Sequence, residues 1–381
     1  MLNNSSSLSF SPSLIFLETT KACDYACRHC RADSRTLPES DELSTTEIID
    51  LIKEIEQIWP YHPEIIFTGG NALMRPDLKE LVSFTARKKF PFSLAPSASD
   101  RLTDDMLSFL KSMGVRSISL SLDGIYGGTH DWLRNKAGSF QKTLEILQRV
   151  RNHGISAQIN TIVMEGNFME LPSVASLVKD SGVRIWELFF LISSGRAERC
   201  LEISPPAYMG VNLWLSGLWK YGLFVRTVES PVFRVIRKIS ENNPGSIDLE
   251  VYRVLQEMTG SLLDEDTTLK PGRGVASAGR KFGGTLFFSS TGEVYPSGLF
   301  NYRLGRIRDS SLKDIVSGGL PYLNARTSGL IKGKCGKCEF LEICGGSRAR
   351  ALSHYGDPFE EDPLCTYHPE LSERGAMHAV N

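Results

Sequence analysis

The stretch Cys23-Asp24-Tyr25-Ala26-Cys27-Arg28-His29-Cys30 places three cysteines within eight residues. It follows an apolar run, Leu14 to Leu17, that predicts a buried strand. Three thiolates so close together suit one metal site, but they leave a tetrahedral site one ligand short. On a four-iron cluster they would leave one iron open for a ligand from outside the protein. The alternative is a structural zinc site, completed by His29 or by a distant fourth ligand.

The spacing Cys-x3-Cys-x2-Cys closely resembles that of the radical SAM superfamily. The resemblance implies that Cys23, Cys27 and Cys30 hold a 4Fe–4S cluster whose open iron binds S-adenosylmethionine (SAM). An electron from a flavodoxin or a ferredoxin would then cleave SAM to a 5′-deoxyadenosyl radical, which abstracts hydrogen from the substrate. By the same resemblance, His29 packs near the adenine of SAM and is not an iron ligand. The chain would be an oxidoreductase. The cluster and SAM would supply the radical, and no side chain is assigned a catalytic role.

Composition limits the partners. The formal net charge of the 381 residues is -1, which gives no reason to expect a nucleic-acid partner. No stretch reaches the ~20 apolar residues that a membrane span needs, and Met1 to Phe10 lack the basic residues of a secretory signal. Seven of the eight cysteines fall into two tight sets, a pattern that indicates metal binding rather than disulfides. We therefore expect a protein of the reducing cytoplasm.

Strand-like and helix-like runs alternate between residues 13 and 193, which is typical of an α/β fold with a parallel sheet. The predicted strands are Leu14–Glu18, Glu64–Phe67, Phe92–Ala95, Ser117–Leu122, Ala157–Val163 and Arg184–Leu191. The predicted amphipathic helices are Thr45–Trp59, Asp77–Lys88, Thr103–Met113, Ser139–His153 and Phe168–Ser181. Six such units with right-handed crossovers make a partial, TIM-like (β/α)6 barrel, whose chemistry lies at the C-terminal ends of the strands.

Three parts are expected along the chain: the partial barrel over residues 13–200, a helical bridge over 201–275, and a small domain over 276–370. The bridge is predicted to contain a helix near Ala207–Tyr221. Residues 283–296 read as a β-hairpin with its turn at Ser290-Thr291-Gly292.

Several strand ends carry motifs that resemble the SAM contacts of the superfamily. Gly69 and Gly70 follow the second strand and, by this resemblance, hold the methionine amino group together with the third residue, Asn71, which is usually acidic. Ser121 and Arg134 would hold the SAM carboxylate, and Arg134 suits that role because a guanidinium binds a carboxylate through two hydrogen bonds. The alternative is a surface arginine paired with Asp131.

Two polar residues, Gln158 and Asn160, point the same way in the fifth predicted strand. If they face inward, they would meet SAM or the substrate. If they face outward, they are merely solvated. Asn160 is counted among the expected SAM-binding residues.

A second cysteine set, Cys335, Cys338, Cys344 and Cys365, could complete a closed site for zinc or for an iron–sulfur cluster. Beside the three-cysteine loop, it resembles the auxiliary-cluster module of the SPASM/Twitch branch. The full SPASM pattern would need further cysteines near Ala276, Ser297 and Arg348. Because none of these is cysteine, the resemblance implies one auxiliary 4Fe–4S cluster, the Twitch arrangement, with a role in electron transfer. The alternative role is a structural staple.

The run from Cys344-Gly345-Gly346-Ser347-Arg348 to Cys365 looks like that of the tetrapyrrole-modifying radical SAM enzymes, which include alternative haem synthases and d-type haem maturases. That resemblance implies a tetrapyrrole side chain as substrate. Its carboxylates could then meet Arg31, Arg196, Arg348 and Arg350, each of which could equally be a structural arginine.

Other substrates and another class of protein stay open. The same architecture modifies ribosomal peptides, sulfatases and sugar-nucleoside intermediates. A protein of another class, a non-catalytic iron–sulfur or zinc-binding scaffold, is favoured only by Asn71. Cys200 stands alone, either as an incidental thiol or as a hydrogen donor near the radical.

Overall fold

The computed structural model describes residues 9–183, 185–269 and 284–369. The strands of this part of the chain form one sheet, in the order β10-β9-β8-β1-β2-β3-β4-β5-β6-β7. β1 to β7 pair in parallel along the sequence, and β8 pairs in parallel with the other side of β1. The strands are β1 (Pro12–Glu18), β2 (Glu64–Thr68), β3 (Phe92–Leu94), β4 (Ile118–Ser121), β5 (Ala157–Val163), β6 (Ile185–Phe190), β7 (Val225–Val228), β8 (Gly284–Phe288), β9 (Glu293–Tyr295) and β10 (Gly305–Arg306).

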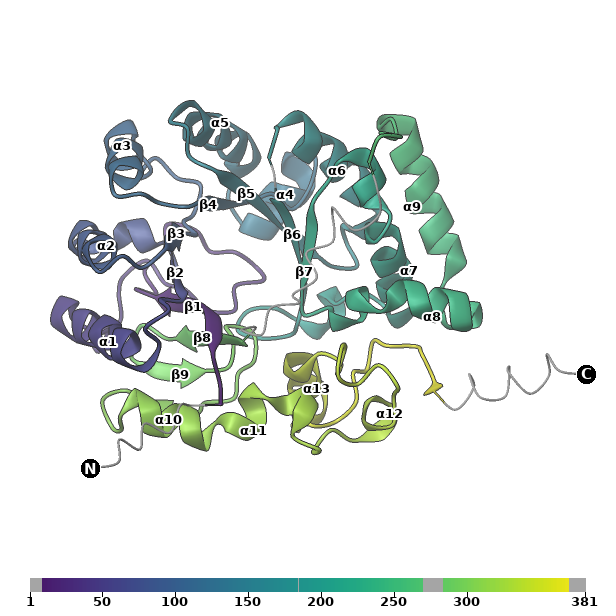
Figure 1. The fold of residues 1–381 in the computed structure, drawn as a ribbon. Coiled ribbons are helices and arrows are strands. Elements are labelled where there is room, and N and C mark those ends of the chain that lie inside the picture. The colour runs from purple at the N-terminus through teal and green to yellow at the C-terminus, as the bar shows by residue number, and fades with distance from the viewer. Residues whose placement is uncertain (1–8, 184, 270–283, 370–381) are drawn as a thin grey trace, which may run out of the picture.

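Helices cover the outer face of this curved sheet, with α1, α2, α3, α5 and α6 arranged around it (Figure 1). The first nine helices are α1 (Thr45–Ile58), α2 (Leu78–Arg87), α3 (Asp104–Ser112), α4 (Gly127–Arg134), α5 (Ser139–Asn152), α6 (Leu171–Asp180), α7 (Pro205–Leu215), α8 (Ile236–Asn242) and α9 (Leu249–Leu262). The C-terminal helices are α10 (Leu312–Gly318), α11 (Leu320–Leu323), α12 (Gly333–Gly336) and α13 (Arg348–Tyr355). The fold is therefore α/β, a partial TIM-like barrel.

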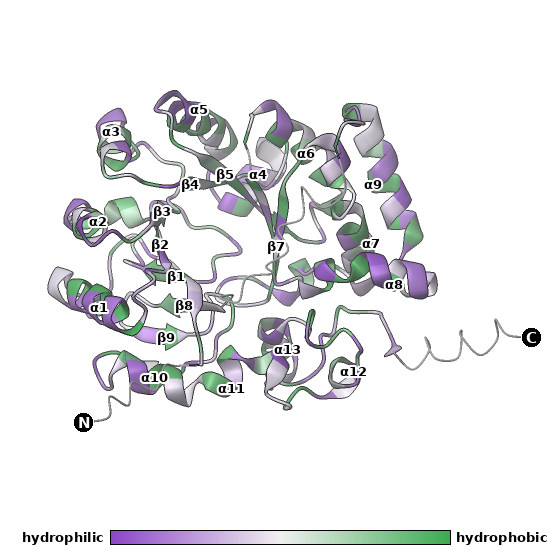
Figure 2. Cartoon of the chain, in the orientation of Figure 1, coloured by the Kyte–Doolittle hydropathy of each residue, from purple (hydrophilic) through white to green (hydrophobic). Residues whose placement is uncertain are grey.

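Local sequence signals account for the helix ends. Ser44 caps α1 and exchanges hydrogen bonds with Glu47, which forms a capping box. Gly114, Gly154 and Gly182 have φ angles of 82°, 64° and 62° where a helix turns back toward a strand. Figure 2 shows hydrophobic and hydrophilic residues alternating along the surrounding helices, as one-sided helices require. In the described part of the chain, no helix is long and apolar enough to cross a bilayer.

The two faces of the sheet differ in burial. Along β6, Trp186, Leu188 and Phe190 are buried in the core shared with the helices, whereas Ile185, Glu187 and Phe189 are partly exposed. β2 and β4 show the same alternation. A closed β/α barrel fills its interior with layers of side chains, so both faces of its strands are buried. Here the inner face of the partial barrel is reachable by solvent.

The predicted strands and helices of the barrel are present, and most of their ends differ by no more than two residues. One helix of the barrel, α4, and one strand, β7, were not predicted. α4 lies between β4 and α5, and the expected helix over residues 168–181 begins with a 3-10 turn at Phe168–Glu170. The predicted bridge over residues 201–275 also contributes a strand, β7, which extends the parallel sheet beside β6. The expected helix near Ala207–Tyr221 is α7 followed by a 3-10 turn, Leu218–Tyr221.

The C-terminal hairpin is present as β8 and β9, with Gly292 at a φ of 87° in its turn. Because β8 pairs with β1, the hairpin extends the barrel sheet. α10 to α13 lie beyond it (Figure 1). The division at residues 200 and 275 remains a prediction, and Arg184 and Ala276 lie outside the described residues.

Candidate functional site

The three-cysteine loop lies at the C-terminal end of β1, the edge at which β/α barrels carry their chemistry. Cys23 and Cys27 are buried and Cys30 is partly buried, and the three pack with Tyr25 into one cluster. Each sulfur lies beside a donor, a surrounding that stabilises a thiolate. The donors are the Tyr25 N–H to Cys23 Sγ (3.4 Å), the Ser34 N–H to Cys30 Sγ (3.5 Å) and Arg134 Nη1 to Cys27 Sγ (3.9 Å).

Burial raises the pKa of the Cys23 and Cys27 thiols above the ordinary value. Metal binding must therefore displace a proton from each, which the nearby donors favour. Among the described residues, no three His, Cys, Asp or Glu side chains converge as the ligands of a single ion do. A four-iron cluster is larger than one ion and holds its thiolates farther apart. The donor set and its surroundings fit such a cluster.

Arg134, the last residue of α4, is bound to Asp123, which lies two residues after the end of β4. Its Nε and Nη2 donate to Asp123 Oδ2 at 2.8 and 2.5 Å, and Asp123 is fully buried. Burial alone would raise the pKa of Asp123, but the Arg134 charge and further partners outweigh it and hold that pKa below its usual range. The alternative pairing with Asp131 is wrong, because Asp131 instead accepts hydrogen bonds from Gly138, Ser139 and Phe140 at the start of α5.

His29 lies against this ion pair. Burial and the Arg134 charge lower the pKa of His29 to about 3, so the ring is neutral at pH 7. Its Nδ1 is buried and has no hydrogen-bond partner within the described residues. A buried polar atom without a partner is costly. A bound group that supplied a donor there would remove this cost, so the surroundings of His29 fit a ligand.

Gly69, Gly70 and Asn71 hold the end of β2 against the cysteine loop. A Cβ on Gly69 would lie 2.4 Å from the Thr20 carbonyl oxygen, and Gly70 and Asn71 donate their N–H groups to Thr20 and Ala22 at 2.7 Å each. The glycines are therefore needed for close contact between two backbone segments, whether or not they also contact SAM.

The Asn71 side chain is fully buried and tied to the protein. Its Nδ2 donates to Asp24 Oδ1 at 3.0 Å and to Ser99 Oγ at 3.2 Å, and its Oδ1 caps the following 3-10 turn. Asn71 thus links the cysteine loop to the segment after β3.

Asn160 faces inward, which was one of the two orientations left open by the sequence. Asn160 lies opposite Ser121 on β4 and opposite Glu187 on β6, all on the solvent-reachable inner face. Gln158 Nε2 donates to Asn160 Oδ1 at 2.8 Å and to Glu187 Oε2 at 2.9 Å. Ser121 and Asn160 therefore share one inner-face row, whereas the glycines and Arg134 lie at neighbouring strand and helix ends. Glu187 was missed, although a charged residue between Trp186 and Leu188 was a usable signal.

The loop after β6 is fastened to the cysteine loop. Arg196 donates through its backbone N–H to Cys30 O at 3.0 Å and through Nε to Cys27 O at 2.9 Å. Gly195 has a φ of 57°, and a Cβ there would lie 2.3 Å from Cys30 O. Arg196 also binds Ser34 and Asp33. Its side chain is therefore a structural clamp and is not free for a substrate.

The other three arginines suggested for substrate binding are also engaged within the protein. Arg31 pairs with Glu18 at 3.3 Å and lies over the Phe287 ring. Arg348 donates to backbone oxygens, and the fully buried Arg350 pairs with Asp362. Cys200 is exposed, which fits an incidental thiol.

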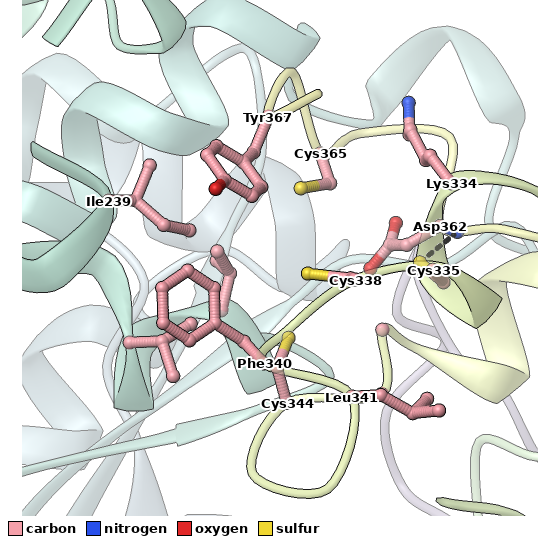
Figure 3. A pocket seen from close by; sticks show the side chains of 14 residues that line it. Ile239, Lys334, Cys335, Cys338, Phe340, Leu341, Cys344, Asp362, Cys365 and Tyr367 are labelled. Atoms are coloured by element: carbon pink, nitrogen blue, oxygen red, sulfur yellow. Dashed lines mark hydrogen bonds between the residues drawn. The ribbon is translucent and has the colours of Figure 1, made fainter. Parts of the chain in front are cut away.

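The second cysteine set lines one pocket, whose empty volume is about 420 Å³ with part of it open to solvent. Figure 3 shows the sulfur atoms of Cys338, Cys344 and Cys365 turned into this space beside Phe340 and Tyr367. The Asp362 N–H donates to the fourth sulfur, that of Cys335, at 3.3 Å. Burial raises the pKa of Cys338 to about 11 and of Cys344 to about 12. Four thiols around one mostly apolar pocket fit a closed metal site or cluster.

A partial β/α barrel with a three-cysteine loop at its carboxyl edge is the arrangement expected of a radical SAM enzyme. Comparisons with known proteins point to the same family. The model of the radical SAM superfamily matches residues 17–177. An AdoMet-dependent heme synthase of Methanosarcina barkeri is 31% identical over 362 residues, covering 94% of this chain and 97% of the relative. A pre-heme d1 synthase of Dinoroseobacter shibae is 25% identical and covers 92% of this chain and 85% of the relative.

Solved structures share the fold. The crystal structure of Streptococcus suis SuiB bound to the precursor peptide SuiA superposes with a TM-score of 0.66 at 13% identity, covering 94% of this chain and 76% of SuiB. Native anSMEcpe with bound AdoMet gives 0.63 at 15% identity, covering 96% of both chains. This chain belongs to the radical SAM superfamily and is an enzyme. Its family implies a 4Fe–4S cluster and SAM.

Proposed function

We propose that the chain is a radical SAM enzyme that modifies a side chain of a tetrapyrrole. The observation that carries this proposal is the 31% identity to an AdoMet-dependent heme synthase over nearly the full length of both chains. Relatives named Fe-coproporphyrin III synthase and pre-heme d1 synthase, each 25% identical over more than nine-tenths of the chain, support the same substrate class.

Cys23, Cys27 and Cys30 would hold the SAM-binding cluster. When bound and reduced, this cluster supplies the electron that cleaves SAM to methionine and a 5′-deoxyadenosyl radical. The chain's own residues position the reactants: Arg134, held by Asp123, offers its Nη1 toward the loop, and Ser121 and Asn160 offer polar groups on the inner face. Gly69, Gly70 and Asn71 supply backbone oxygens at the end of β2. These contacts with SAM are part of the proposal.

Cys335, Cys338, Cys344 and Cys365 would hold one auxiliary 4Fe–4S cluster. A set of four cysteines leaves no iron open, so its role is to pass an electron, not to bind substrate. A flavodoxin or a ferredoxin would be the electron donor. Seven of the eight cysteines fall in these two sets, a pattern that suits metal binding in a reducing compartment, and we propose the cytoplasm as that compartment.

The proposal is tested on anaerobically reconstituted protein. Dithionite and SAM should yield 5′-deoxyadenosine, and addition of a carboxylate-bearing porphyrin such as iron coproporphyrin III should change the porphyrin's mass. Cleavage of SAM without any change in iron coproporphyrin III, sirohaem or their partly modified derivatives would overturn the substrate class. It would leave the radical chemistry standing.

A further inference from the structure

The inner face of the sheet carries a row of polar residues at one level. Ser121, Asn160, Glu187 and Arg226 are successive partners across β4, β5, β6 and β7. Neighbouring strands lie about 4.8 Å apart, so Arg226 is roughly 10 Å from the Asn160 strand. The first two residues of the row are those proposed to meet SAM. The last two therefore lie beside the SAM position, where a substrate must lie to lose hydrogen to the radical.

Arg226 differs from the arginines that the sequence suggested. Its side chain is exposed and forms no hydrogen bond or ion pair of 4 Å or less with the residues that the structure describes. By alternation along β7 it shares the inner face with Val228, whereas Val225 is buried on the outer side. Arg31, Arg196, Arg348 and Arg350 all bind protein groups, although Arg348 Nη2 and Arg350 Nε are buried without a hydrogen-bond partner among the described residues. Arg226 is thus a guanidinium on the inner face that is available to a ligand.

Glu187 is the acidic group that faces Arg226. Glu187 is paired in register with Arg226, yet the two side chains form no ion pair. Glu187 Oε2 instead accepts a hydrogen bond from Gln158. Burial raises the pKa of Glu187 in spite of the nearby Arg226 charge. The second oxygen of Glu187 forms no hydrogen bond with the described residues.

We propose that Arg226 binds a carboxylate of the substrate on the inner face of the sheet, beside the row of Ser121 and Asn160. The inference rests on the proposed function and extends it, because it assigns the subsite that recognises a carboxylate-bearing side chain. A planar guanidinium binds a carboxylate through two parallel hydrogen bonds. A ligand bound to Arg226 on β7 lies within two strands of Asn160 on β5.

The test is the binding of coproporphyrin III to anaerobic holoenzyme, followed by the porphyrin absorbance, for wild type, R226Q and R226K. Arg226→Gln should weaken binding about 10- to 100-fold, as expected for the loss of a charged hydrogen-bonded pair, and Arg226→Lys should recover part of it. Iron content and substrate-free SAM cleavage should equal those of wild type. The coproporphyrin methyl ester, which has lost every carboxylate, should bind wild type at least as weakly as coproporphyrin III binds R226Q.

Arg253 offers a matched control, since it is an exposed arginine on α9, outside the barrel. Arg253→Gln removes the same charge and should bind coproporphyrin III as wild type does. Equal affinity of R226Q and wild type would overturn the subsite while the proposed function stood. Failure of wild type to bind any carboxylate-bearing porphyrin would overturn the proposed substrate class and this inference with it.

Discussion

Arg134 lies between Asp123 and Cys27. Two of its nitrogens bind the buried Asp123 carboxylate, at 2.8 and 2.5 Å, and the third lies 3.9 Å from the Cys27 sulfur. One guanidinium therefore joins the end of β4, the end of α4 and the three-cysteine loop. Its positive charge offsets both the carboxylate and the thiolate that a metal would require.

Arg134→Gln should destabilise the protein. The substitution leaves Asp123 buried without its cation, which typically costs about 3–5 kcal/mol. Urea denaturation of the metal-free protein measures this loss. Arg28→Gln is the control, because the exposed Arg28 side chain contacts Trp132 and no buried carboxylate, so its effect should stay within about 1 kcal/mol. Equal stabilities of the two variants would contradict the role given to the Asp123 pair.

Stability should fall in mild acid because of His130. Burial lowers the pKa of this histidine to about 4, and its Nδ1 accepts the Asp123 N–H at 3.1 Å. The folded-state pKa lies below the unfolded value of about 6.5, so the unfolded chain binds the proton more readily. The stability contributed is complete above pH 6.5 and is lost as the pH falls toward 4. At pH 5 the share of the loss from His130 should be about 2 kcal/mol, beside a similar share from His29, whose pKa is about 3.

Urea denaturation of the metal-free protein at pH 8 and pH 5 measures this loss. His130→Gln keeps a hydrogen-bond acceptor but cannot titrate, so its stability should change by less between the two pH values. A wild-type stability that rises in acid, or an identical pH response in the variant, would count against this account.

The two cysteine sets should load independently. Wild type, reconstituted anaerobically, should hold about eight irons and eight sulfides per chain. Cys338→Ala should lower both to about four while SAM cleavage in the absence of substrate continues. Cys200→Ala is the matched control and should leave the iron unchanged, because Cys200 is exposed and outside both sets. Unchanged iron in the Cys338 variant would remove the auxiliary cluster from the account.

Gly195→Ala should disturb the cysteine loop. Its φ of 57° disfavours a side chain, and its Cβ would lie 2.3 and 2.5 Å from the Cys30 and Arg31 carbonyl oxygens. Gly138 has a similar φ of 77° but open space around it. Gly138→Ala should therefore cost only the left-handed strain of about 1–2 kcal/mol, and Gly195→Ala clearly more. Melting temperatures and iron content separate the two, and equal effects would mean that the contact with the cysteine loop is unimportant.

Much of the barrel could be predicted because its signals are local. The cysteine spacing, the capping box at Ser44 and the glycines after α3, α5 and α6 depend on a few neighbouring residues. β7 was missed because four residues, Val225 to Val228, give too short an alternation to stand out among helical segments. The pairing of β8 with β1 joins segments about 270 residues apart, and no local pattern encodes it.

Side-chain roles were harder to predict than positions. The residues suggested for SAM lie around one edge and one inner face, yet Asp123 was not foreseen as the partner of Arg134, because burial decides it. Arg196 and Arg350 looked available in the sequence and are held by backbone and carboxylate groups. Arg226 gave no signal, since an isolated arginine becomes informative only when its strand, its face and its lack of partners among the described residues are known.

The most direct test of the central claim is 5′-deoxyadenosine formation by anaerobically reconstituted protein, with dithionite and SAM, in wild type and in Cys27→Ala. Cys27 is one of three thiols in the loop, so the variant should fold but lose the SAM-binding cluster. The account predicts 5′-deoxyadenosine from wild type and none from the variant. Equal yields from both proteins would contradict the assignment of the three-cysteine loop as the radical-generating centre.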